Sequence, residues 1–150
     1  MIEHYDLDRI FILDSMHDQR VGLVELKSNE LIFHIVKLKR YKPFCRKAQI
    51  YYEKHRDFKS CDIIFKGLEK ADLLAEVKTY TGDTFSGELY YDEDFINFLN
   101  EHQYIIEIVN MYCGYMTIVI EAALVNEKEE YCEEKCVITI TSNEIIYHWN

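Results

Sequence analysis

The chain has 150 residues, of which 49% are hydrophobic and 14% aromatic, so we expect one domain, residues 1–150, with a core of its own. Its net charge of −10 argues against general binding to the phosphate backbone of nucleic acids. No apolar run reaches the roughly 18 residues of a membrane helix, and the acidic N-terminus is unlike a signal peptide. We therefore expect a cytoplasmic protein that does not bind a membrane.

The predicted secondary structure is dominated by strands, because apolar and polar residues alternate along most of the chain. In chain order, the predicted strands cover residues 8–14, 21–26, 31–39, 61–68, 72–80, 104–112, 115–125, 135–141 and 145–149. The turns or loops between them are expected at Ser28-Asn29 and at residues 81–87, 113–114, 126–134 and 142–144. These elements follow one another at hairpin spacing, which favours antiparallel pairing over alternating strands and helices.

Two segments depart from this pattern. Residues 43–55 fit either a helix opened by Pro43 or a strand, with a slight preference for a strand over residues 49–54. Residues 92–102 predict a helix, with apolar side chains on one face and Asp92 as its N-cap. The predicted fold is thus mainly β, either an antiparallel β-sandwich or a strongly bent sheet with one short helix.

A short motif occurs twice, as "SNELIFHI" at residues 28–35 and as "SNEIIYHW" at residues 142–149. Its alternate positions are large and apolar in both copies, so they should share one face of a strand and enter the core. The residues expected in the core are Leu31, Phe33, Ile35, Ile145, Tyr147 and Trp149. We interpret the repeat as two hairpins with one core face, whose histidines, His34 and His148, lie on the opposite face.

Histidines also form the alternative candidate site. A metal-binding protein or a metal-dependent enzyme would need His17, Asp18, His34 and His148 to meet a further ligand in space. The five cysteines are scattered, which predicts neither a disulfide framework nor a tetrahedral zinc site. Since a nucleophile elbow and a glycine-rich phosphate loop are also missing, the sequence assigns no catalytic residue, metal or cofactor.

The charge is distributed unevenly. Residues 1–59 contain 12 Lys and Arg against 9 Asp and Glu, whereas residues 60–150 contain 5 against 18. Residues 37–59 hold 9 basic residues interleaved with aromatic ones, a pattern that suits nucleic acid because rings stack on bases while cations neutralise phosphates. Pairing with acids elsewhere in the chain is the alternative for this segment.

Two stretches resemble a group of known families. "DSMHDQRVGLVELKSNELIFHI" and "CDIIFKGLEKADL" are similar to segments of small, mostly uncharacterised bacterial β-rich families, in which a His-Asp step precedes a strand, a turn and another strand. Some of those families are similar to immunity proteins that neutralise polymorphic toxins. The resemblance covers about residues 12–75 and matches His17 and Asp18 in position. It implies a role in binding rather than in catalysis.

We therefore expect a non-catalytic protein-binding domain of the immunity-protein type, with an acidic surface that attracts a basic protein. The candidate contact residues are all acidic: Asp92, Glu93, Asp94, Glu127, Glu129, Glu130, Glu133 and Glu134. A homodimer formed through an exposed strand edge stays open as a further mode of association.

Overall fold

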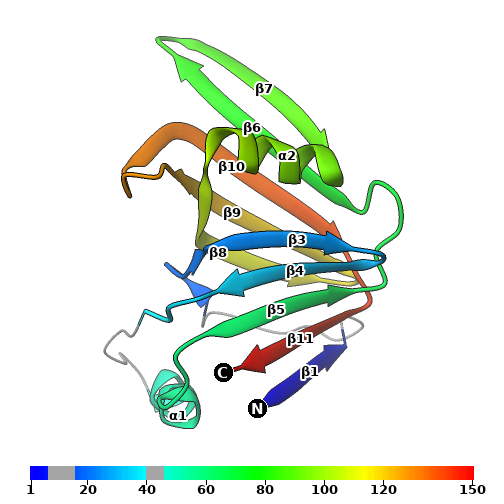
Figure 1. Cartoon of the computed structure of the whole chain (residues 1–150), viewed down its shortest axis with the longest axis vertical. Helices are drawn as coiled ribbons and strands as arrows, with labels where there is room; N and C mark the ends of the chain where they lie inside the picture. The colour runs from blue at the N-terminus through cyan, green and yellow to red at the C-terminus, as the bar shows by residue number, and fades with distance from the viewer. Residues whose placement is uncertain (7–15, 40–45) are drawn as a thin grey trace.

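The computed structural model describes residues 1–6, 16–39 and 46–150, without the side chains of residues 47, 48, 51 and 52. In this part of the chain, eleven strands form two antiparallel sheets that face each other, and two helices accompany them (Figure 1). The mainly β fold is as predicted. The strand expected at residues 8–14 lies outside the described residues. Neither described helix is long and apolar enough to cross a membrane.

The five-stranded sheet has the order β1-β11-β5-β4-β3. Its strands in chain order are β1 (Ile2–Asp6), β3 (Leu23–Lys27), β4 (Glu30–Ile35), β5 (Cys61–Lys66) and β11 (Glu144–Trp149). Strands β4 and β11 contain the two copies of the repeated motif, and both pair with β5. The six apolar residues expected in the core are each at most 3% exposed, which confirms that prediction.

The six-stranded sheet has the order β2-β8-β9-β10-β6-β7. Its strands in chain order are β2 (Arg20–Val21), β6 (Leu73–Thr81), β7 (Thr84–Tyr91), β8 (Ile105–Gly114), β9 (Thr117–Val125) and β10 (Tyr131–Thr141). The chain crosses from this sheet to the other at Gly22, because β2 pairs with β8 while β3 pairs with β4. At the far edge, the hairpin of β6 and β7 reaches beyond the rest of the molecule (Figure 1).

The second copy of the motif does not form a hairpin, which corrects our interpretation. The first copy follows the Ser28-Asn29 tip of the β3–β4 hairpin, as predicted. In the second, β10 belongs to the six-stranded sheet and β11 to the five-stranded one, so the segment between them passes from one sheet to the other. Ser142 is buried there, with its hydroxyl 2.7 Å from the carbonyl oxygen of Lys66. The two copies of the motif therefore have similar sequences but lie in two different kinds of connection, a hairpin and a crossover between the sheets.

Helix α2 (Glu93–His102) confirms the helix predicted at residues 92–102. It buries an apolar face against the inner side of β7, where the rings of Tyr90 and Phe98 lie 4.6 Å apart. Asp92, however, does not cap it. Its carboxylate instead accepts hydrogen bonds from the backbone amides of Ala71 and Leu73, at 2.7 and 3.3 Å, and so ties the start of β6 to the helix.

Helix α1 (Arg46–His55) replaces the strand that we preferred for residues 49–54. Most of its residues are good helix formers, and Gln49 donates a 2.6 Å hydrogen bond to Glu53 one turn later. Its last residue, His55, is only 1% exposed and lies 4.2 Å from the Trp149 ring, centroid to centroid. This contact with β11 is long-range in sequence, so the local pattern of "QIYYE" could not reveal it.

Three predicted connections are too long or misplaced. The turn expected at residues 81–87 shrinks to Gly82-Asp83, because β7 already begins at Thr84. Strand β8 continues through Gly114, and the turn follows at Tyr115-Met116. The loop expected at residues 126–134 ends at residue 130, where β10 begins. The extended parts of β7 and β8 pair with β6 and β9, whereas β10 begins with an irregularity, since its register against β9 shifts between Tyr131 and Lys135.

Candidate protein-binding site

The turn between β9 and β10 is held rigid by one asparagine. The Asn126 side-chain oxygen accepts hydrogen bonds from the backbone amides of Lys128 and Glu130, at 2.9 and 3.0 Å. Its backbone amide donates to the carbonyl oxygen of Glu130 at 2.9 Å, and its carbonyl oxygen accepts from the amide of Glu129 at 2.9 Å. These four hydrogen bonds fix the backbone of the turn.

This turn presents a dense group of carboxylates. Residues 126–134 contain five Glu and one Lys. Four of the predicted contact residues, Glu127, Glu129, Glu130 and Glu133, are exposed, and Glu134 is half-buried. Tyr131, in their middle, is 61% exposed. We define the acidic turn as residues 126–134. Tyrosine is enriched in protein-binding surfaces, because its ring provides contact area with little loss of side-chain freedom.

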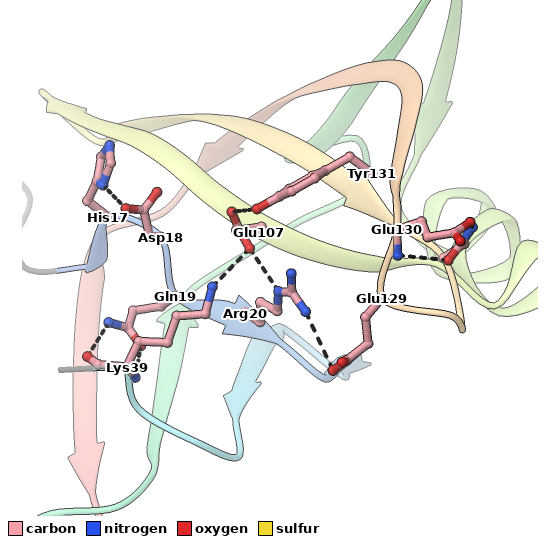
Figure 2. Close-up of polar contacts among 10 residues, drawn as sticks. His17, Asp18, Gln19, Arg20, Lys39, Glu107, Glu129, Glu130 and Tyr131 are labelled. Carbon is pink, nitrogen blue, oxygen red and sulfur yellow. Dashed lines mark hydrogen bonds and ion pairs between the residues drawn. The ribbon is translucent and has the colours of Figure 1, made fainter. Parts of the chain in front are cut away.

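A buried carboxylate, Glu107, is bonded to one residue of the acidic turn, Tyr131 (Figure 2). Glu107 on β8 accepts hydrogen bonds from Arg20 Nε at 2.8 Å, from Lys39 Nζ at 3.0 Å and from the Tyr131 hydroxyl at 2.6 Å. Burial raises the pKa of Glu107, but these three hydrogen bonds outweigh it and lower the pKa from 4.5 to about 2. Glu107 is therefore ionised at neutral pH and holds three donors from separate segments.

One of those donors, Arg20, also contacts the acidic turn, and another, Lys39, is held by the N-terminal part of the chain. The Arg20 guanidinium lies 3.6 Å from Glu129 and 5.9 Å from the centre of the Tyr131 ring. Lys39 is fixed by Gln19, whose side-chain amide both donates to and accepts from the Lys39 backbone, at 2.9 and 2.8 Å. Hydrogen bonds and ion pairs through Arg20 and Glu107 thus link the acidic turn to other segments of the chain.

The other predicted contact residues form a second, separate acidic group. Glu93 and Asp94 are exposed on the first turn of α2, and Asp92 is half-buried and bonded to backbone amides. The acidic turn lies toward the opposite end of α2 (Figure 1). A ten-residue helix is about 15 Å long, so one small contact would not cover both groups.

The alternative histidine site is only partly assembled. His34 and His148 both lie opposite Asp62 in the five-stranded sheet, one on each side of it. His34 lies 2.8 Å from Asp62 and, through its other ring nitrogen, 2.7 Å from Glu25. His17 instead pairs with Asp18 at 2.9 Å, in the segment before β2. Among the residues that the structure describes, no three His, Cys, Asp or Glu side chains are arranged to hold a metal ion.

The basic segment at residues 37–59 is partly paired within the molecule. Lys39 bonds to Glu107, Lys54 pairs with Glu3, and Arg56 lies 3.7 Å from Asp57. These contacts follow the alternative that we weighed against nucleic-acid binding, because paired cations are less available to phosphates.

Sequence reasoning missed the central residues of the site, Glu107 and Arg20. Glu107 occupies an outward position of an alternating strand, and such a position predicts an ordinary exposed glutamate. Its partner Arg20 is 87 residues away in sequence. No local pattern connects the two, and the pairing follows only from the short contact between β2 and β8.

Comparison with known proteins provides no further guide to this site. No protein-family model matches the chain, and searches of curated proteins and of solved structures find no match.

Proposed function

We propose that the chain is a non-catalytic, cytosolic protein-binding domain that holds a basic partner protein at the acidic turn. The observation that carries the proposal is the fixed presentation of four exposed glutamates around an exposed tyrosine. Asn126 already holds the backbone of the turn and Glu107 the Tyr131 side chain, so binding would cost little conformational entropy.

The charge of the molecule supports a basic partner. Residues 60–150 contain 5 basic against 18 acidic residues, a surplus that accelerates encounter with a positive surface. A cationic cleft of a toxin, such as that of a nuclease, carries the positive charge that an acidic surface attracts. The similarity of residues 14–35 and 61–73 to families that include immunity proteins agrees with this class of partner.

The test removes charge from the acidic turn without altering its shape. The turn variant changes Glu127, Glu129, Glu130 and Glu133 to Gln. A control variant removes the same four charges elsewhere, at the exposed positions Asp57, Glu69, Glu93 and Asp94, as Asn or Gln. Each protein, and the unmodified chain, is used to capture binding proteins from a lysate of the native host, which mass spectrometry then identifies.

We expect one basic protein to be retained by the unmodified chain and by the control variant, to be lost with the turn variant, and to elute as salt rises. Retention of the same proteins by all three baits would contradict the proposal. Loss of the partner with the control variant alone would indicate that the partner binds at the start of α2 and not at the acidic turn.

A further inference from the structure

Strand β7 is an open edge of the six-stranded sheet, and no described element pairs with its outer side. It pairs with β6 over eight residues without a bulge. Its sequence, "TFSGELYY", contains no Lys, Arg or Pro and a single charged residue, Glu88. Phe85 and Leu89 are 51% and 56% exposed on it. A long, regular and apolar edge of this kind is a template for pairing with another strand.

The other described edges are protected in the ways that monomeric sheets use. Strands β1 and β3 are five residues long, and each carries two acidic or basic residues besides its apolar ones. Strand β2 has only two residues, and β8 contains an irregularity after Ile108, where β2 no longer covers it. Among the described edges, β7 is therefore the longest that is regular and carries a single charge.

We propose that β7 pairs with β7 of a second copy of this chain, antiparallel across a two-fold axis at Gly87. The pairing would join two six-stranded sheets into one continuous sheet. It does not rest on the proposed function, because it uses only the free edge of β7 and none of the carboxylates of the acidic turn.

The sequence of β7 selects this register. A two-fold axis normal to the sheet must place some residue opposite its own copy. With Gly87 on the axis, residues 84–90 all find a partner, and with Ser86 or Leu89 on the axis only five residues of β7 do. An axis at Glu88 would pair seven residues, but it would put two carboxylates directly opposite each other, which is destabilising.

The chosen register is complementary on both faces. Phe85 lies opposite Leu89 of the second copy, and the symmetry repeats this apolar pair, on the outer face of the sheet. On the inner face, Glu88 lies opposite Ser86 of the second copy, so no like charges are directly opposed. For a chain with a net charge of −10, a nearly uncharged edge is where two copies can meet with the least repulsion.

Two double variants test both the contact and its register. The lysine variant carries Phe85→Lys and Leu89→Lys, and the glutamate variant carries Phe85→Glu and Leu89→Glu. Both positions are exposed, and circular dichroism checks that each variant stays folded. In the proposed register, each variant alone places like charges opposite each other twice, whereas a mixture places Lys opposite Glu twice. A Tyr112→Lys variant, at an exposed position on β8, is the matched control.

Analytical ultracentrifugation of the unmodified chain and of the control should give a concentration-dependent species of twice the 18.0 kDa chain mass. Each double variant alone should raise the dimer dissociation constant at least about tenfold, and mixing the two should restore dimers. A monomeric unmodified chain at all concentrations, or double variants that dimerise as tightly as it does, would overturn the proposal. Failure of the mixture to dimerise would overturn the register and with it the two-fold contact.

Discussion

The acidic turn and the β6–β7 hairpin belong to the same sheet but are built in opposite ways. The turn is short and charged, and its Tyr131 is held by a hydrogen bond to Glu107. The hairpin is long, nearly uncharged along β7 and open at its edge. The first suits an electrostatic contact that salt weakens, and the second suits backbone pairing and apolar contact, which salt screens little. One sheet thus offers two surfaces that salt concentration should separate.

The largest effect is expected when the carboxylate that supports the turn is removed. We expect Glu107→Ala to lower the free energy of unfolding by about 3 kcal/mol, because Arg20, Lys39 and Tyr131 all lose their common acceptor. Chemical denaturation measures the effect. The control, Glu121→Ala at an exposed position on β9, should cost about 0.5 kcal/mol or less. Equal losses in the two variants would show that Glu107 gives the turn no special support.

Acid should weaken the same support. The pKa of Glu107 in the folded chain, about 2, lies below its ordinary value of 4.5. Its contribution is therefore fully present above pH 4.5 and is lost as the pH falls toward 2, with a loss of about 3 kcal/mol. Unfolding measured between pH 7 and 2 should show a smaller acid loss for Glu107→Gln than for the unmodified chain. Parallel pH profiles of the two proteins would rule out this linkage.

A milder change should loosen the turn without disturbing Glu107. Asn126→Ala removes the acceptor of two backbone amides and should lower the free energy of unfolding by about 1 kcal/mol. Amide hydrogen exchange should then accelerate at Lys128 and Glu130. Asn97→Ala, at an exposed position on α2, is the control and should change neither quantity. Unchanged exchange in the Asn126 variant would mean that the backbone alone fixes the turn.

The smallest effect is expected in the hairpin. Leu89→Lys should change the free energy of unfolding by less than about 0.5 kcal/mol, since Leu89 is exposed and lies opposite Glu76, which can pair with the new lysine. Denaturation at a protein concentration below that of dimer formation measures it. A loss comparable to that of Glu107→Ala would mean that β7 is packed more tightly than its exposure indicates.

What the sequence predicted was local. Alternation along β4 and β11 identified Phe33 and Tyr147 as core residues, because side chains on a strand must point to opposite faces. The partner of each strand was not predictable, so the second copy of the motif seemed to form a hairpin although it crosses between sheets.

In the site, too, local features were predicted from the sequence and long-range contacts were not. The exposed glutamates of the acidic turn were identified from their charge alone, and the structure adds their fixed arrangement. The pairing of Glu107 with Arg20 depends on a contact across 87 residues. The helix at residues 46–55 likewise ends in a contact of His55 with Trp149 that is long-range in sequence and that the local pattern did not reveal.

The most direct test of the central claim is the affinity of the captured basic partner, measured by calorimetry for the unmodified chain, the turn variant and the control variant at two salt concentrations. Removing the four charges of the acidic turn should weaken binding at least about tenfold and flatten its salt dependence. The control variant should stay within about twofold of the unmodified chain. Equal weakening by both variants would contradict the claim, because net charge alone would then explain the binding.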